Sequence, residues 1–139
     1  MAIKVVIDTN VLVASLSSKS IYHWLIKLLL NEKIELYVTD EIILEYEEIL
    51  GTKYSGSVAA NFLVALKELP NVHFTQIYFY WNLISDPDDN KFVDCYIAAG
   101  ANYLLTHDSH FSILKSIEFP RINVINIHEF SEVIKSGLE

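Results

Sequence analysis

The sequence predicts an α/β fold with a central parallel sheet that helices cover on both faces. Short apolar runs rich in β-branched residues, beginning with Ile3–Ile7, alternate with longer stretches of helical periodicity. Strands separated by helices form β-α crossover units, and such units build parallel sheets with helices packed on each side. The 139 residues contain no internal repeat, low-complexity tract or linker. We therefore expect one domain over residues 1–139.

The expected strands are short and mostly apolar. Ile3–Ile7 has the composition of a buried central strand, because Lys4 is its only polar residue. Val72–Trp81 is rich in β-branched and aromatic residues, which predicts a short strand followed by a packing surface. The full set of expected strands is Ile3–Ile7, Ile34–Val38, part of Val72–Trp81, Tyr103–Thr106 and Ile122–Ile127.

Helical stretches are expected between and after these strands. They are Val11–Leu16, Ile21–Leu30, Glu41–Leu50, Val58–Leu69, Asn90–Ala99, a short helix or turn at Phe111–Leu114, and Glu129–Ile134. Boundary residues support these limits. The expected boundary residues are Ser20 and either Thr39 or Asp40 as N-caps, Gly51 as a C′ residue, Pro70 as a stop, and Pro87 in a turn over Ser85–Asp89.

Composition limits the classes of function. The net charge is −8 and Arg121 is the only arginine, which argues against a protein that clamps nucleic acid with its whole surface. Any chemistry on phosphates must therefore use metal ions and a few local lysines. Cys95 is the only cysteine, so we expect no disulfide and a reducing compartment. No signal peptide or membrane span is expected, which predicts a soluble cytoplasmic protein.

Acidic residues recur where the expected elements begin or end. They are Asp8, Glu45, the stretch Asp86-Pro87-Asp88-Asp89 with Asp94 behind it, and Asp108. Parallel strands bring their carboxyl ends to one edge of a sheet, where ligands of open α/β folds bind. Carboxylates gathered there repel each other unless they share protons or cations. Oxygen ligands suit Mg²⁺ or Mn²⁺ held together with substrate phosphates, so the pattern predicts a metal-dependent nuclease.

Simpler interpretations exist for the first two acids. Asp8 and Asn10 are both good N-cap residues, and Asn10 would alternatively orient Asp8. In the helix expected over Glu41–Leu50, Glu45 and Glu47 lie at opposite borders of the apolar stripe. The helical wheel therefore leaves both glutamates as candidates.

The later acids also have simpler interpretations. Acids that precede a helix complement its dipole, which would explain Asp86 and Asp89, and Asp108 would cap a following turn. On the wheel, Asp94 points away from the buried side, which favours solvent exposure. The pattern ranks Asp89 before Asp94, and Asp94 before Asp86. Thr106 adds a polar group at the end of the strand before Asp108.

Other polar residues indicate no further site. His107 and His110 are three residues apart, but without cysteines or a clear third ligand they do not predict a zinc site. Cys95 is expected to be a small core residue.

The chain resembles the PIN-domain family, in particular the small prokaryotic VapC-type toxins of toxin–antitoxin pairs. The resemblance is carried by Ile7-Asp8-Thr9-Asn10, by Glu45, by Asp86-Pro87-Asp88-Asp89-Asn90-Lys91-Phe92 and by Thr106-His107-Asp108. It implies a Rossmann-like three-layer α/β/α sandwich and endoribonuclease activity that depends on Mg²⁺ or Mn²⁺. It also implies frequent homodimers and inhibition by a small cognate antitoxin.

The resemblance also assigns residues. Asp8 and Asp108 match the family's first and last acids, and Glu45 matches its glutamate rather than Glu47. Asp94-Cys95-Tyr96-Ile97-Ala98-Ala99 resembles the family's Asp-x-x-Ile-Ala-Ala helix, which points to Asp94, whereas Asp89 belongs to a segment found in one branch. Both are kept as candidate ligands.

The resulting hypothesis is hydrolysis of RNA with one or two metal ions. Asp8, Asp108 and one or both of Asp89 and Asp94 would bind a divalent ion, and Glu45 would complete the site or bind a second ion. Asn10 and Thr106 would orient ligands or water. One alternative is a haloacid-dehalogenase-type phosphatase, although Asn10 stands where that class needs a second aspartate. Another is an inactive PIN scaffold that only binds a protein partner.

Overall fold

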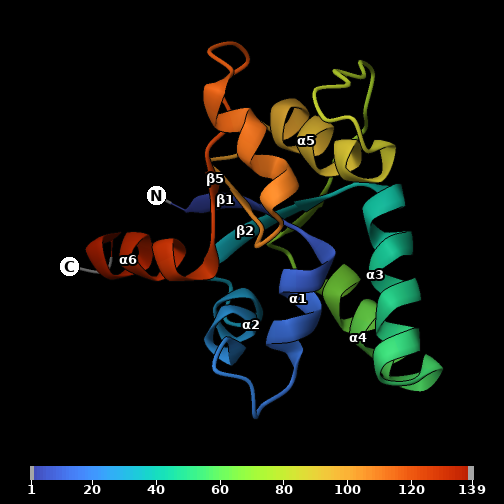
Figure 1. The fold of residues 1–139 in the computed structure, drawn as a ribbon. Helices are drawn as coiled ribbons and strands as arrows, with labels where there is room; N and C mark the ends of the chain where they lie inside the picture. Colours follow the sequence, from blue (N-terminus) through green and yellow to red (C-terminus); the bar gives the residue numbers. More distant parts are fainter. Residues whose placement is uncertain (1, 138–139) are drawn as a thin grey trace.

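The computed structural model describes residues 2–137, and within this range five strands form one parallel sheet (Figure 1). The order of the strands across the sheet is β3-β2-β1-β4-β5. Their bounds are β1 (Ile3–Ile7), β2 (Ile34–Val38), β3 (Val72–Phe74), β4 (Tyr103–Leu105) and β5 (Val124–Ile125). Every neighbouring pair is parallel, as the sequence predicted.

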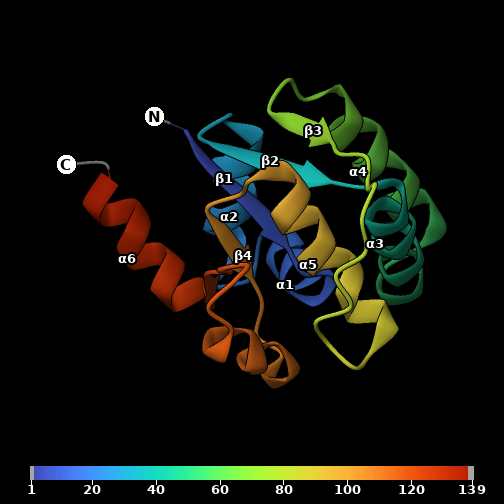
Figure 2. The ribbon, with the colours of Figure 1, turned by 90° about the horizontal axis from the view of Figure 1, so that it is seen from above.

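Helices cover both faces of this sheet. They are α1 (Thr9–Leu16), α2 (His23–Leu30), α3 (Asp40–Lys53), α4 (Gly56–Glu68), α5 (Pro87–Ala99), the 3₁₀ helix η1 (Ser109–Ser116) and α6 (Ile127–Gly137). Helix α5 lies on one face, whereas α1, α2 and α4 lie on the other (Figure 1). Seen from above, α6 lies on the side of the molecule opposite α3 and α4 (Figure 2). The predicted three-layer α/β/α sandwich is confirmed.

The central strand is buried on both faces, as expected of a parallel sheet between helices. Val5, Val6 and Ile7 have no exposed surface. Strand β1 pairs with β2 through Ile3 to Val5 and with β4 through Val5 to Ile7. The single cysteine, Cys95, is buried in the same core, as predicted.

Two expected helix boundaries are wrong. Gly51 does not end its helix, because α3 continues to Lys53 and the amide of Tyr54 donates to the carbonyl of Leu50. Ser20 is not an N-cap, because α2 begins only at His23. Thr39 does cap α3, since its hydroxyl accepts a hydrogen bond from the amide of Ile42 at 3.2 Å.

Other observed boundaries differ from the expected ones next to segments without regular structure. The strand expected within Val72–Trp81 ends at Phe74, and the chain then runs without regular structure to Ser85. Helix α5 starts at Pro87 rather than Asn90, with Asp86 as its N-cap, because proline is well suited to the first helical position. The last strand covers only Val124–Ile125 of the expected Ile122–Ile127.

The direction of strand addition reverses beside β1. The chain first adds β2 and β3 on one side, with α1 to α4 as crossovers, and then returns through α5 to place β4 on the other side of β1. Ligand sites of open α/β sheets form at such a switch point, beyond the carboxyl ends of the strands. In this chain the switch point lies at the ends of β1 and β4, where Asp8 and Thr106 follow.

A buried tyrosine fixes helix α3 to the end of β1. The hydroxyl of Tyr46 donates to the carbonyl of Ile7 at 2.5 Å, and the Tyr46 side chain is fully buried. Burial raises the pKa of Tyr46 well above its ordinary value, so the hydroxyl stays protonated and acts as a donor. This bond ties the helix that carries Glu45 to the strand that precedes Asp8.

We predict that Tyr46→Phe lowers the free energy of unfolding by about 1–2 kcal/mol, because one buried carbonyl loses its donor. Urea denaturation at neutral pH measures the change. Tyr78→Phe is the matched control, since the Tyr78 side chain is 86% exposed and its hydroxyl should contribute almost nothing. Equal stability of both variants would contradict the assigned role of the Tyr46 hydroxyl.

Candidate functional site

Asp8 lies at the switch point and is held by the neighbouring strand. Its amide donates to the carbonyl of Leu105 at 2.9 Å, which extends the ladder between β1 and β4. Its carboxylate accepts a hydrogen bond of 2.8 Å from the hydroxyl of Thr106. Asp8 occupies the N-cap position of α1 but makes no side-chain cap bond. The capping interpretation therefore does not explain this aspartate.

Burial and neighbouring charges act on Asp8. Only 6% of the residue is exposed. Burial raises the pKa of Asp8, the hydrogen bond from Thr106 opposes this, and the negative charges of Glu45 and Asp108 raise it further. Three acids that are far apart in the sequence thus lie close enough to act on one another.

Glu45 reaches the same region from α3, and both of its carboxylate oxygens have partners. The hydroxyl of Thr9 donates to Oε2, and the ammonium group of Lys91 lies 2.6 Å from Oε1. The Lys91 side chain is 13% exposed and the Glu45 side chain 24%. Glu47, the other candidate on the helical wheel, is exposed. The structure therefore distinguishes the two glutamates, which the helical wheel could not: Glu45 lies in the acidic region, and Glu47 faces solvent.

Asp89 enters from the first turn of α5. One of its oxygens, Oδ2, is buried and has no hydrogen-bond partner among the described residues. Burial raises the pKa of Asp89 to about 6, and the charges of Asp86, Asp108 and Asp8 contribute to this increase. A buried carboxylate oxygen without a donor is costly, so an oxygen in this position suits a bound cation or a proton.

Asp108 caps the 3₁₀ helix η1 and also faces Asp89. Its Oδ1 accepts a hydrogen bond of 2.9 Å from the amide of His110 and lies 3.3 Å from Nδ1 of the His110 ring. The amide of Asp108 donates to the hydroxyl of Thr106 at 3.0 Å. The hydroxyl of Thr106 thus connects Asp8 to the backbone of Asp108.

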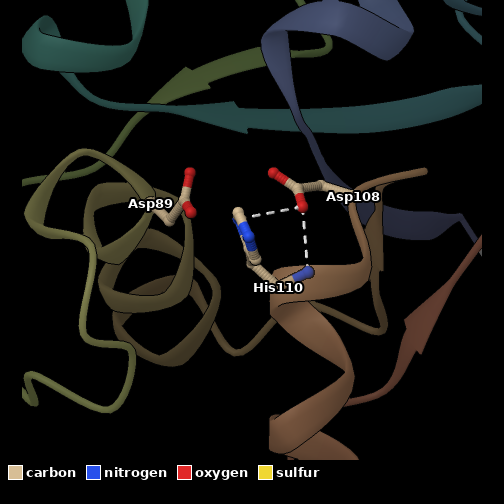
Figure 3. A group of neighbouring side chains, drawn as sticks. All are labelled: Asp89, Asp108 and His110. Atoms are coloured by element: carbon tan, nitrogen blue, oxygen red, sulfur yellow. Dashed lines mark hydrogen bonds and ion pairs between the residues drawn. The ribbon is translucent and has the colours of Figure 1, made fainter.

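Two aspartates and a histidine form a group of potential metal ligands at this position. Asp89, Asp108 and His110 each offer one ligand atom, and these atoms lie within 4.8 Å of one another. Figure 3 shows the imidazole ring between the two carboxylates, with Asp89 on α5 and the other two residues at the start of η1. Two carboxylates and an imidazole are suitable ligands for a divalent cation. Such an ion would also give the unpartnered oxygen of Asp89 a partner.

Asp94 is placed differently from the other predicted acids. It is 3% exposed, so the solvent exposure expected from the wheel is wrong. Its Oδ1 accepts a hydrogen bond of 3.0 Å from the amide of Trp81. Burial raises the pKa of Asp94, and the only acid that contributes is Glu41. Asp94 lines a separate cavity of about 300 Å³ with Glu41 and Gln76.

The secondary candidates lie around the cluster. Asp86 caps α5 by accepting from the amide of Asp88 at 3.0 Å, and its charge acts on Asp89. Thr106 contacts two of the acids, as described above. Asn10 is exposed on α1 and lines a small cavity with Tyr22 and His107, whose lining includes no acidic residue.

Three residues of the site were not predicted from the sequence: Thr9, Lys91 and His110. Thr9 and Lys91 stand inside the acidic motifs, directly beside Asp8 and two residues after Asp89. The spacing of His110 from His107 suggested only a zinc site, which the sequence did not support. A search for cations and hydroxyls near each acid motif would have found the first two.

Comparison with protein families gives a match over most of the chain. The family profile described as PIN domain matches residues 4–110. This chain belongs to the PIN-domain family. The matched range contains Asp8, Glu45, Asp89 and Asp108 as well as His110. PIN domains are generally nucleases, so the haloacid-dehalogenase alternative is not retained.

Solved structures share the fold of this PIN domain at low sequence identity. A chain of VapBC2 from Rickettsia felis, crystallised with a DNA fragment from its promoter, is 14% identical with a TM-score of 0.61. That match covers 89% of this chain and 98% of the other. The PIN domain of T. brucei RRP44 is 12% identical with a TM-score of 0.51, covering 99% and 84%. A search of curated proteins gave no match. Within residues 2–137, no helix is both long and apolar enough to span a membrane.

We predict that the acids of this PIN domain make its metal-free stability depend on pH. The pKa of Asp89 is raised from 3.8 to about 6 in the folded protein. Between these two pH values, folded Asp89 therefore holds a proton that the unfolded chain has released. Stability from this group is therefore fully present below about pH 4 and is lost as the pH rises to about 6. Asp89→Asn should remove this loss, so the variant should become increasingly more stable than wild type across that range. Urea denaturation from pH 4.5 to 7.5 in the presence of a chelator measures this.

The matched control is Asp88→Asn, which changes the same charge one residue away on an exposed position of α5. Its stability relative to wild type should vary much less with pH. A constant stability difference between wild type and Asp89→Asn over this range would contradict the raised pKa of Asp89.

Proposed function

We propose that this PIN domain is a divalent-metal-dependent endoribonuclease that acts as the toxin of a toxin–antitoxin pair. The observation that supports the nuclease function best is the placement of Asp8, Asp89 and Asp108 at the switch point of a PIN fold, together with Glu45. The unpartnered oxygen of Asp89 supports a bound cation. The proposed ion is Mg²⁺ or Mn²⁺, because carboxylate oxygens suit both.

In such a site, a divalent ion would lower the pKa of a water molecule and neutralise charge on the phosphoryl oxygens. The chain's own residues hold the acids in place. Thr106 fixes Asp8 and the backbone of Asp108, while Thr9 fixes Glu45. Asp89 remains without a donor on one oxygen and is therefore the acid most available to an ion. Asp94 is proposed only as an acid that positions the backbone at Trp81.

Lys91 is a cation that lies directly against this acidic site. It neutralises Glu45 at 2.6 Å from a largely buried position. When a divalent ion is bound, the same ammonium group would be placed to attract a substrate phosphate, because Glu45 would then share its charge with the ion. In a chain of net charge −8, a local cation of this kind compensates for a surface that otherwise repels nucleic acid.

A cavity beside Asp108 supports a nucleic-acid substrate. Its volume is about 290 Å³, and its lining includes Tyr22, His107, Lys115 and His128 together with the acidic side chains of Asp108 and Glu129. Rings on which bases can stack, next to a lysine that can bind phosphate, suit a single-stranded nucleotide chain. We therefore propose single-stranded RNA as the substrate.

A toxin function is supported by similarity and by an exposed aromatic surface. The Rickettsia felis structure is of VapBC2 bound to a DNA fragment from its promoter, and a chain of that structure shares the fold of this protein. Tyr78, Phe79 and Phe119 are 86%, 62% and 83% exposed, and the rings of Phe79 and Phe119 both contact Trp81. Exposed apolar groups of this size indicate a protein interaction surface. We propose a small cognate antitoxin as the partner, and a second copy of this chain is an alternative occupant.

We predict that the purified protein cleaves single-stranded RNA with Mg²⁺ or Mn²⁺ and not with a chelator. Asp8→Asn should reduce cleavage by about a hundredfold or more, because it removes a negative charge from the acidic site while keeping the size of the side chain. A fluorescent RNA cleavage assay measures the rates, and the matching DNA oligonucleotide tests the preference for RNA.

The control variant is Asp88→Asn, which removes an equal charge from an exposed position outside the cluster. It should cleave at the wild-type rate. If wild type and Asp8→Asn cleave equally, the nuclease proposal is wrong. An absence of both cleavage and metal binding in wild type would favour the inactive scaffold that binds only a protein partner.

Lys91 gives a separate prediction about metal affinity. Lys91→Met should increase the affinity for Mn²⁺ by roughly tenfold, because a positive charge is removed from beside the acids and Glu45 becomes available. Titration calorimetry measures the change. Lys67→Met, on an exposed position of α4, is the matched control and should leave the affinity unchanged. An equal or lower affinity in Lys91→Met would show that Lys91 does not compete with the ion for Glu45.

A further inference from the structure

The group that best fits a metal ion is not purely acidic. Asp89, Asp108 and His110 place two carboxylate oxygens and one imidazole nitrogen within 4.8 Å of one another. Glu45 and Asp8 contribute charge nearby, but each has hydrogen-bond partners. Histidine was not expected in this site from the sequence. Its presence bears on which metal ion the site binds.

The contact between His110 and Asp108 alone would have an ordinary explanation. Asp108 caps η1 through the amide of His110, and a 3.3 Å contact to the imidazole follows easily from that turn. Asp89 is the independent observation, because it comes from α5 and belongs to no such turn. Its Oδ2 is buried and has no hydrogen-bond partner among the described residues. The Asp89 carboxylate lies beside the same imidazole (Figure 3). A cation held between Asp89 on α5 and the pair Asp108 and His110 on η1 would explain why these side chains converge.

The mixed donor set discriminates between metal ions. Mg²⁺ prefers oxygen ligands in near-ideal octahedral geometry, whereas imidazole suits first-row transition ions. Affinity for a nitrogen-containing site rises from Mn²⁺ towards Zn²⁺ and copper. A single imidazole beside two carboxylates therefore shifts preference away from Mg²⁺ without excluding it.

We propose that His110 is a nitrogen ligand of the metal site, so that the site selects Mn²⁺ and other first-row transition ions over Mg²⁺. This inference rests on the proposed nuclease function and narrows its cofactor. Asp89 and Asp108 are the oxygen ligands that would accompany His110. The Mg²⁺ ion remains a weaker occupant of the same site.

The test uses Mn²⁺ as a spectroscopic probe of the whole protein. Pulsed electron paramagnetic resonance of the Mn²⁺-loaded protein should show coupling to an imidazole ¹⁴N nucleus, and this coupling should be absent in His110→Ala. The His110 side chain is 71% exposed, so the substitution should not affect folding. His128→Ala, another exposed histidine, is the matched control and should keep the signal.

Calorimetry with Mg²⁺ and Mn²⁺ provides the second measurement. Loss of a group that merely supports a ligand typically costs ~10–100-fold in affinity, so loss of the ligand itself should weaken Mn²⁺ binding at least about tenfold in His110→Ala. His110→Asp, which supplies oxygen instead of nitrogen, should bring the affinities for Mn²⁺ and Mg²⁺ closer together. Unchanged affinity ratios in both variants would overturn the proposal.

The outcomes distinguish this inference from the proposed function. If wild type binds Mn²⁺ and cleaves RNA but shows no imidazole coupling, His110 is not a ligand and the nuclease function stands. If wild type binds no divalent ion and cleaves no RNA, both proposals fail.

Discussion

The hydrogen bond from Thr106 to Asp8 is the interaction on which the rest of the site depends. It joins the ends of two parallel strands that are neighbours in space but 98 residues apart in the sequence. The strands meet there because the chain reverses its direction of strand addition beside β1. The same hydroxyl accepts from the amide of Asp108, so one threonine sets the relative positions of two acids. Helix α3 is fixed to this point separately, through Tyr46 and the carbonyl of Ile7.

This rigid arrangement keeps like charges close together. Burial and mutual repulsion raise the pKa of Asp8 and Asp89, so in the absence of metal both groups hold protons more readily than ordinary aspartates. Lys91 balances the charge of Glu45. The unbalanced charge remains between Asp89 and Asp108, where His110 lies. The electrostatics and the geometry of the potential ligands would therefore favour a cation at the same position.

The sequence predicted the sheet, and it predicted that Asp8, Glu45, Asp89 and Asp108 lie near one another. Both predictions depend on local patterns and on the rule that parallel strands end at one edge. The sequence pattern did not predict the buried position of Asp94. The helical wheel assumes that the side of α5 away from the sheet meets solvent, but the irregular chain after β3 covers Asp94 and donates the amide of Trp81 to it. That segment has no periodicity from which its path could be predicted. The start of α5 was also misplaced, by three residues, because Pro87 was assigned to a turn instead of the first helical position.

The repulsion among these carboxylates indicates that the acids serve a function rather than stability. A protein selected only for stability would not keep the buried oxygen of Asp89 without a donor, since each such group costs free energy. An asparagine or serine at this position would also avoid the repulsion from the neighbouring acids. Natural proteins retain destabilising groups mainly where activity requires them. If an ion binds there, the free energy lost in the metal-free state would be recovered, because binding to the folded state alone stabilises it by mass action. The same residues would thus link the stability of the protein to its cofactor.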